Sequence, residues 1–192
     1  TYASGVMGVA RTLASRINAA AEEVAAVRNE AHQGVKASVD SINSLLSELE
    51  PVDQAIRTGL AGTENDLDNL DHRDRILKQL AEEVGLRVVQ KSDGGTALYT
   101  DSGITLFDVV PRAVEMQPVG SLTPGLPGPS VFIDGVQVSG VNSIMSIGQG
   151  KLVAQLAVRD EMSITYEAQL DETARSLVSL FAEHDQSATP SL

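Results

Sequence analysis

The first third of the chain carries an apolar stripe along a predicted helix that is too long to fit inside a compact domain of this size. Between Val6 and Leu60, apolar side chains recur at a mean spacing of about 3.6 residues, the period of an α-helix. They are Val6, Val9, Leu13, Ile17, Ala20, Val24, Val27, Ala31, Val35, Val39, Ile42, Leu46, Leu49, Val52, Ile56 and Leu60. A continuous helix from Val6 to Leu49 would be roughly 65 Å long. The sequence therefore predicts one long helical spine against which the remaining chain packs.

Charged side chains fill the opposite face of this helix. We assign to solvent Arg16, Glu22, Glu23, Arg28, Glu30, Lys36, Asp40 and Glu48. Pro51 disturbs the helix because it lacks a backbone N–H and crowds the carbonyl of Ser47. Since the stripe continues through Ile56, we expect a kink at Pro51 rather than an end.

Two further helices are predicted. The second starts at a cap residue, Thr63 or Asn65, and its apolar face is Leu67, Leu70, Leu77, Leu80 and Val84. Its connection to the first helix is only a few residues long, so the two should be antiparallel. The third runs from near Gly148 to His184, with a looser apolar pattern around residues 159–163.

The relative lengths of the helices predict the path of the chain. The second helix is long enough to cover only the far half of the spine, around residues 42–56. We therefore expect the third helix to run antiparallel to the first along its near half, with Phe181 close to Val6 and Val9. Both ends of the chain would then lie at the same end of the rod.

Between the second and third helices the apolar period changes from 3.6 to 2. Strands are predicted at residues 86–90, 96–99, 104–107, 131–133 and 136–138, whereas residues 117–130 hold four of the seven prolines and form a loop. The predicted fold class is α+β, an elongated antiparallel helical bundle with a small, mostly antiparallel β insert. Its parts are a discontinuous helical rod (1–85 and 148–184), the insert (86–147) and a tail (185–192).

Composition limits the function classes. The formal charge is −12, which repels phosphate backbones and argues against a nucleic-acid binder. No cysteine is present, so disulfides and thiolate sites are absent, and no apolar run is long enough for a membrane span. The chain begins without Met, without a visible signal peptide and in helix-forming sequence, and we expect it to be an internal fragment.

The densest group of possible metal ligands is Asp66, Asp68, Asp71, His72 and Asp74. A calcium-binding EF-hand loop counted from Asp66 would need Gly and Glu where Asp71 and Leu77 stand. Helical geometry spreads these carboxylates around the axis, so a solvated first turn is the favoured interpretation.

Two Arg–Asp pairs, Arg73–Asp74 and Arg159–Asp160, interrupt apolar stripes. They are either surface charges or cross-helix arginine–carboxylate bonds, and the sequence leaves both readings open. The chain's histidines, His32, His72 and His184, share no motif, and no nucleophile elbow or phosphate-binding loop follows a strand. We predict no catalytic, cofactor-binding or metal site, and no enzyme activity.

Two segments resemble the flagellar hook-associated protein 1 (FlgK) family, the first hook–filament junction protein. The first is Asn65-Asp66-Leu67-Asp68-Asn69-Leu70-Asp71-His72-Arg73-Asp74 with Leu77, Leu80 and Val84–Val89 after it. The second is Gly150–Glu161, followed by Tyr166–Asp171-Glu172. Ser41-Ile42-Asn43 is similar to a further family segment. His72 stands where Gln is more usual, Pro51 interrupts an expected unbroken helix, and the insert is short for the family.

The resemblance implies a non-enzymatic structural component of the bacterial flagellum, required for motility. Such proteins are exported through the type III channel without a cleaved signal, so the expected location is extracellular. Implied partners are the hook protein, the next junction protein, an export chaperone before secretion, and other copies in a ring formed through terminal helices that this fragment lacks. Without those helices, and with a charge of −12, the fragment is expected to be monomeric in solution.

Two alternatives remain open. Flagellin or another axial flagellar protein shares long helices and an acidic, cysteine-free composition, although its characteristic segments differ. An extracellular ligand-binding sensor module is the alternative from another class. It would have a four-helix pattern without a β insert and a pocket lined by convergent polar groups.

Overall fold

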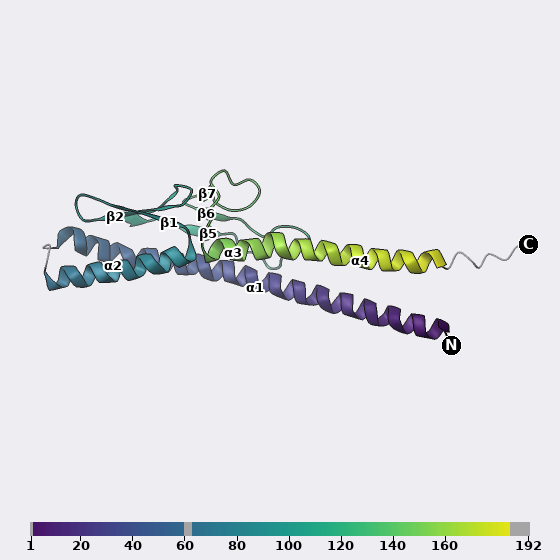
Figure 1. Cartoon of the computed structure of the whole chain (residues 1–192). Helices are drawn as coiled ribbons and strands as arrows, with labels where there is room; N and C mark the ends of the chain where they lie inside the picture. Colours follow the sequence, from purple (N-terminus) through teal and green to yellow (C-terminus); the bar gives the residue numbers. More distant parts are fainter. Residues whose placement is uncertain (1, 60–62, 185–192) are drawn as a thin grey trace, which may run out of the picture.

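In the computed structural model, which describes residues 2–59 and 63–184, a single helix occupies most of the first third of the chain. This helix, α1 (Tyr2–Thr58), has 57 residues and runs through Pro51 without ending. The other helical segments are α2 (Glu64–Glu83), α3 (Lys151–Ala157) and α4 (Ser163–His184), with a π-helical turn, η1 (Val158–Met162), between the last two. The molecule is elongated along α1 and belongs to the α+β class (Figure 1). The predicted tail, 185–192, lies outside the described residues.

The helices follow the path that their lengths predict. α2 runs back along the far half of α1, and α3 and α4 run antiparallel to α1 along its near half (Figure 1). The described helical residues at the two ends, Tyr2 and His184, consequently lie at the same end of the molecule. The β strands lie on one side of the rod, near its middle and far half (Figure 1).

α2 contacts α1 through a regular face of the helix. Arg73, Ile76, Leu80 and Val84 are spaced three or four residues apart and are all buried. Leu80 is buried as predicted, but the assignment of Leu67 to this face is wrong, because Leu67 is 58% exposed. At about 100° per residue, Leu67 and Leu80 point about 140° apart around the helix axis, so Leu67 faces solvent.

The strands form two antiparallel sheets. The first sheet has the order β1 (Leu86–Gln90), β2 (Thr96–Thr100), β3 (Thr105–Asp108) and β4 (Val110–Pro111). The second has the order β5 (Val114–Met116), β6 (Val131–Ile133) and β7 (Val136–Gln137). The sequence did not predict β4 and β5, which are short and close to a proline.

The β6–β7 hairpin shows how local sequence sets the register. Asp134 and Gly135 have φ angles of 50° and 77°, so both central residues of the turn are left-handed. This is the type I′ geometry that suits the twist of a two-residue hairpin and that Asp-Gly favours. Ile133 therefore pairs with Val136 across the turn.

The far half of α1, α2, α3 and both sheets share one hydrophobic core. Its fully buried side chains include Val35, Leu46, Leu49, Leu80, Leu98, Leu106, Phe107, Val131 and Leu152. Gly34 lies in the middle of α1 because α3 passes close by: a Cβ there would be 2.7 Å from Cδ of Gln155. The close approach of the two helices explains a glycine that would otherwise only weaken the spine.

The near half of the spine is only partly covered. We call residues 5–27 of α1 and residues 164–180 of α4 the arm. Ile17 and Val24 are half-buried, whereas Val9 and Val178 are each 70% exposed, and the two helices diverge toward their ends (Figure 1). The expectation that the third predicted helix covers the near half of the stripe therefore holds toward the base of the arm, at Val24, and is wrong at its outer end, at Val9. The expected contact of Phe181 lies outside the described side chains.

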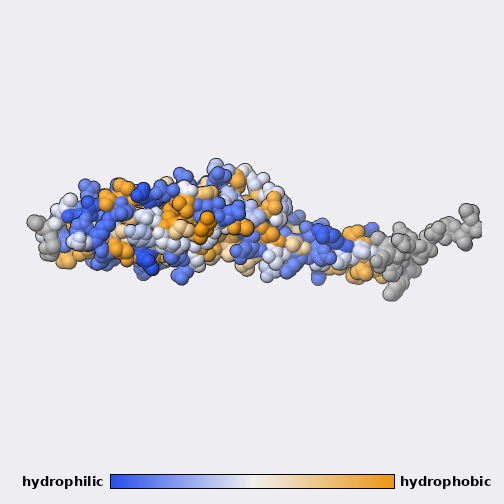
Figure 2. Space-filling view, turned by 90° about the horizontal axis from the view of Figure 1, so that it is seen from above, coloured by the Kyte–Doolittle hydropathy of each residue, from blue (hydrophilic) through white to orange (hydrophobic). Residues whose placement is uncertain are grey.

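No helix among the described residues is both long and apolar enough to cross a membrane. Viewed from above, apolar and charged side chains are interspersed over the rod, and apolar ones gather over its middle, where the β insert lies (Figure 2).

Candidate functional site

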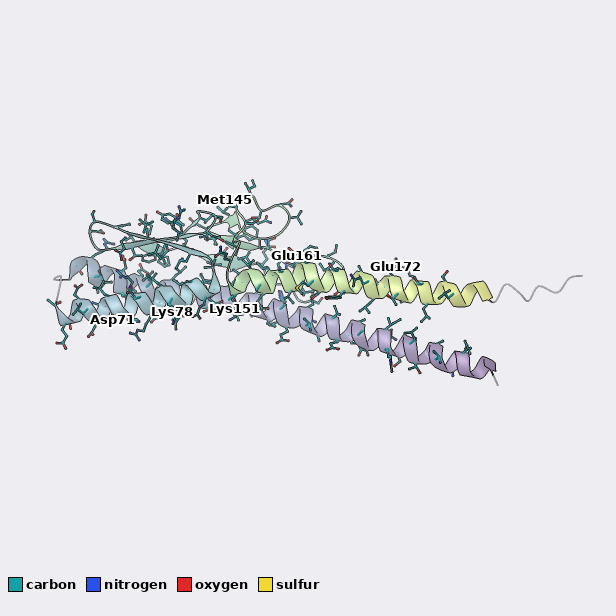
Figure 3. All side chains as sticks on the ribbon, viewed as in Figure 1. Asp71, Lys78, Met145, Lys151, Glu161 and Glu172 are labelled. Carbon is teal, nitrogen blue, oxygen red and sulfur yellow. The ribbon has the colours of Figure 1, made fainter. Side chains whose placement is uncertain are left out.

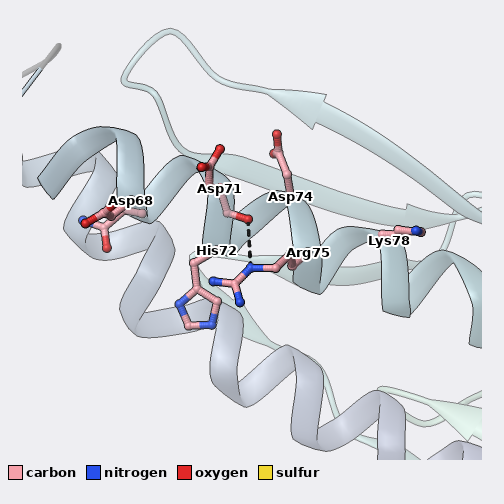
Figure 4. A pocket seen from close by; sticks show the side chains of 7 residues that line it. Asp68, Asp71, His72, Asp74, Arg75 and Lys78 are labelled. Carbon is pink, nitrogen blue, oxygen red and sulfur yellow. Dashed lines mark hydrogen bonds between the residues drawn. The ribbon is translucent and has the colours of Figure 1, made fainter. Parts of the chain in front are cut away.

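The acidic group on α2 is spread along one exposed helix. Asp68, Asp71, His72 and Asp74 line an open depression together with Asn69, Arg75 and Lys78 (Figure 4). His72 turns toward α1, where its Nε2 lies 2.7 Å from Oε1 of Glu48. Within residues 2–59 and 63–184, no three His, Asp or Glu side chains are close enough to share a metal ion.

Arg73 does not make the cross-helix bond that the sequence left open. Its Nε and Nη2 donate to Oδ1 of the adjacent Asp74, at 3.0 and 2.8 Å. Both residues belong to α2, and the Asp74 side chain is 64% exposed. The Arg73 side chain is only 9% exposed, so it contributes to the α1–α2 contact by packing.

Arg159 combines a local pair with contacts to other segments. Its Nε and Nη2 bind Oδ1 and Oδ2 of Asp160 at 2.8 and 2.7 Å, a bidentate bond within η1. Nη2 also donates to the carbonyl of Pro129 at 2.8 Å, and Nη1 donates to Nδ1 of His32 on α1 at 3.4 Å. Arg159 is fully buried, so these contacts replace its hydration and connect three parts of the chain.

The π-helical turn explains why the apolar pattern loosens at residues 159–163. The backbone N–H of Ser163 donates to the carbonyl of Val158, five residues earlier, and the hydroxyl of Ser163 donates to the same oxygen at 2.7 Å. The extra residue in the turn shifts the helical face, which lets Arg159 point into the protein between apolar positions. Such turns are frequent at functional positions of helices.

Arg28 makes the cross-helix ion pair that the sequence did not identify. Its side chain is only 3% exposed, and Nη1 lies 3.4 Å from Oε1 of Glu167 on α4. Nε donates to the carbonyl of Arg159 at 3.1 Å, and Nη1 donates to the carbonyl of Thr123 at 3.0 Å. Nη2 donates to the carbonyl of Leu126.

The assignment of Arg28 to the solvated face is therefore wrong. A signal for its burial was present, because Arg28 is four residues after Val24 and three before Ala31, both on the stripe. By contrast Val27, which we placed on the stripe, is 45% exposed. The helical period places Arg28 on the inward face at that turn, and its charge was the only reason to assign it to solvent.

Residues 117–130 form a strap across the base of the arm. β5 and β6 pair directly, and a turn of 2–5 residues is usual for such a hairpin. The chain instead makes a long excursion between them. The backbone N–H of Gly125 donates to Oε2 of Glu167 at 2.9 Å, and that of Gly128 donates to Oδ1 of Asp160 at 2.8 Å. Side chains thus supply partners that a sheet would otherwise provide.

Glycine is required at position 128 by the close approach of the arginine. A Cβ on Gly128 would lie 2.7 Å from Nε of Arg159, and that guanidinium is fixed by Asp160 and Pro129. The two arginines and two carboxylates therefore form a cradle that binds the backbone of the strap. We call Arg28, Arg159, Asp160 and Glu167 the strap cradle.

His32 lies at the edge of the strap cradle. Burial lowers the pKa of His32 below its ordinary value of 6.5, and the nearby charge of Arg159 lowers it further, as does Lys36. Asp160 opposes this shift. Because Nδ1 accepts from Arg159, the neutral imidazole is the form that fits the site.

Asn43 fixes the second sheet to the spine. Its Oδ1 accepts from the backbone N–H of Val114 at 3.0 Å, and its Nδ2 donates to the carbonyl of Val114 at 2.8 Å. The side-chain amide thus completes the edge of β5 as a neighbouring strand would. On the far half of α1, the buried Asp53 likewise accepts from the backbone N–H of Thr96 at 2.6 Å.

These interactions join α4, the strap and the second sheet to α1. The comparison with known families agrees with this architecture. The family model described as the flagellar hook-associated protein FlgK helical domain matches residues 2–189. The chain belongs to this family.

A FlgK structure has the same fold. The flagellar hook junction protein FlgK from Burkholderia pseudomallei matches with a TM-score of 0.60 and 22% sequence identity, over 80% of this chain. This chain spans 28% of the length of that protein. No curated protein matches the chain.

Segments that resembled the FlgK family in sequence hold structural positions in the described chain. Ile42 is in the core and the adjacent Asn43 binds β5. Leu80 is fully buried in the contact between α1 and α2, and Arg159 belongs to the strap cradle. These residues act by packing and hydrogen bonding, in keeping with a structural component of the flagellum.

Proposed function

We propose that this chain is part of a structural subunit at the hook–filament junction of the bacterial flagellum. The observation that carries the proposal is the match of residues 2–189 to the helical domain of the flagellar hook-associated protein FlgK. In this proposal the subunit leaves the cell through the flagellar type III channel without a cleaved signal, and it contributes to motility by joining hook to filament.

The arm supports a role in assembly. Its two helices end at the same end of the molecule, and their outer faces keep apolar residues such as Val9 and Val178 exposed. Exposed apolar stripes on paired helices are surfaces on which further helices can pack. We propose that contacts with other copies in a ring, with the hook protein and with the next junction protein are made through the arm. An export chaperone would cover the same stripe before secretion.

The strap cradle supports a structural role for the base of the arm. Arg28 on α1, Glu167 on α4 and the strap meet there, so the two helices of the arm are joined to each other and to the β insert. We propose that residues 1–85 and 148–184 act as one rod, with residues 86–147 as an insert on its side.

The test is the location of the full-length protein in the bacterium that makes it. Flagella purified from these cells should contain the protein, and gold-labelled antibody should mark the point where hook meets filament. Label distributed along the filament would instead indicate a flagellin-like protein, and absence from purified flagella would refute the proposal.

A pair of variants tests the role of the arm. Val9→Asp places a charge on the exposed stripe and should reduce incorporation of the protein into flagella. Val88→Asp on β1 is the matched control, because Val88 is also exposed (42%) but lies outside the arm. Equal incorporation of the two variants would exclude the stripe as an assembly surface.

A further inference from the structure

An uncharged loop beside α3 presents apolar side chains to solvent. Residues 135–150 contain no charged side chain, although 21% of the chain is Asp, Glu, Lys or Arg. We call residues 140–147 the apolar loop. Val141 is 91% exposed and Ile144 is 98% exposed, far more than any neighbouring core residue. Met145, at the outer side of the β insert, is also exposed (Figure 3).

The backbone of the apolar loop is held by hydrogen bonds at both ends. Ser143 Oγ donates to the carbonyl of Gln137 at 3.0 Å, and Ser102 Oγ donates to the carbonyl of Met145 at 3.1 Å. The N–H of Ile147 donates to the carbonyl of Val138 at 3.2 Å. Since the loop is anchored in this way, it would lose little conformational entropy when a partner binds.

A cavity of about 310 Å³ lies between the apolar loop and the helix formed by α3 and η1. Its walls are mainly apolar, and include Val138, Ile147 and Leu156, while Asp160 and Glu161 line one side. Asp160 is already bonded to Arg159 and to Gly128. In the part of the chain that the structure describes, no hydrogen bond or ion pair reaches the carboxylate of Glu161, which is exposed on η1 (Figure 3).

We propose that the apolar loop and this cavity form a docking site for a partner protein that inserts a lysine or arginine side chain. The alkyl stem of such a side chain fits against the half-buried Val153 and Ala157, and its charged end meets Glu161. Apolar surface of the partner beside that residue covers Val141 and Ile144. The proposal goes beyond the junction role, because it assigns a contact surface outside the arm.

Charge decides between a basic partner and a second copy of the chain. Each copy has a formal charge of −12, so a second copy is disfavoured at the acidic rim of the cavity, whereas a basic segment is attracted to it. The proposed partner is therefore a different protein that presents a Lys or Arg within an apolar surface.

Two variants separate the proposed contacts from folding. Glu161→Lys reverses the one charge in the cavity that lacks a partner, and Glu82→Lys makes the same change at an exposed position on α2. Ile144→Ser removes an apolar side chain that is almost fully exposed, so it should leave the thermal stability of the protein unchanged. Val136→Ser, at a neighbouring position that is 43% exposed, is its control.

The experiment places a photo-crosslinking amino acid at position 144 of the full-length protein in the bacterium that makes it. Purified flagella are irradiated, and the adducts are mapped by mass spectrometry. We expect an adduct with another flagellar protein close to a Lys or Arg, and a yield that falls about fivefold in the Glu161→Lys background and not with Glu82→Lys. With the crosslinker at position 141 instead, Ile144→Ser should lower the yield and Val136→Ser should not.

A crosslinker at the exposed position 82 on α2 serves as the reference for non-specific adducts. Three results would overturn the docking site: no adduct from position 144 above this reference, equal yields with the two lysine variants, or adducts with another copy of the same chain. If the protein is missing from purified flagella, the junction role fails separately. The crosslinking yield with and without Glu161→Lys is then compared in irradiated intact cells. Loss of the adduct in Glu161→Lys would support the docking site, and an unchanged or absent adduct would refute it.

Discussion

Replacing Arg28 by Met should destabilise the protein far more than a typical substitution on the surface of a helix. The change removes the donors to the carbonyls of Thr123, Leu126 and Arg159 and the ion partner of Glu167. Leaving one side of a buried ion pair uncompensated costs about 3–5 kcal/mol. The Glu167 side chain is 19% exposed, so water solvates part of the freed carboxylate, and we expect a loss of about 2–4 kcal/mol in the free energy of unfolding.

The matched control is Arg16→Met on the same helix. Arg16 is exposed, so its replacement should change stability by less than about 0.5 kcal/mol. The assay is urea unfolding followed by far-UV circular dichroism. Because domains are stable by about 5–15 kcal/mol, the predicted loss would move the midpoint substantially.

Hydrogen exchange distinguishes local release of the strap from general weakening. In Arg28→Met the amide of Gly125 should lose protection, because its acceptor Glu167 is no longer held by the arginine. The amide of Gly128 should keep its protection, since its acceptor Asp160 is still bound by Arg159. A cost below about 1 kcal/mol with unchanged exchange at Gly125 would refute the assignment of Arg28 to the strap cradle.

Three further changes test other parts of the structure. Leu80→Ala should cost about 2–5 kcal/mol in urea unfolding because Leu80 is fully buried, whereas Leu67→Ala should cost less than about 0.5 kcal/mol; similar costs would contradict the register of α2. Pro51→Ala should leave stability unchanged or raise it modestly, since it restores a donor within α1; a loss of several kcal/mol would mean that the core packs around the proline. For His32 the folded-state pKa is lowered, so the unfolded chain binds the proton more readily, and the free energy of unfolding should fall as the pH drops through 6.5. His32→Gln should remove that part of the pH dependence. If the free energy of unfolding depends on pH identically in both proteins, His32 is not the group responsible.

The helices were predictable because their signals are local and repeated. The period of the stripe in α1 extends over many turns, and Leu80 follows from the same periodicity in α2. The β6–β7 hairpin follows from Asp134-Gly135, since the turn type depends on two adjacent residues. Strand β4 was missed because its two residues include a proline and pair with β3 across the single residue Val109, which gives no turn signal. Strand β5 was missed because its three residues pair with β6 only across the long segment 117–130.

The strap cradle was not predictable from any local pattern. Arg28, Thr123, Arg159 and Glu167 are far apart in sequence, and their bonds depend on where α1, η1, α4 and residues 117–130 meet. The sequence showed two adjacent Arg–Asp pairs, but it could not show that one arginine stays beside its neighbour on α2 while the other also binds His32 and Pro129.

The sequence by itself determined the long helix, the order of the helices and of strands β1, β2, β3, β6 and β7, the absence of cysteine chemistry and the family resemblance. These follow from periodicity, composition and short motifs, which act over a few neighbouring residues. The tertiary structure decided which polar groups are buried. A charged residue such as Arg28 is stable inside only where donors and acceptors from distant segments converge, as the strap and α4 do here. It also decided that the stripe of α1 stays partly open near Val9, because α4 diverges from the spine instead of following it to its end.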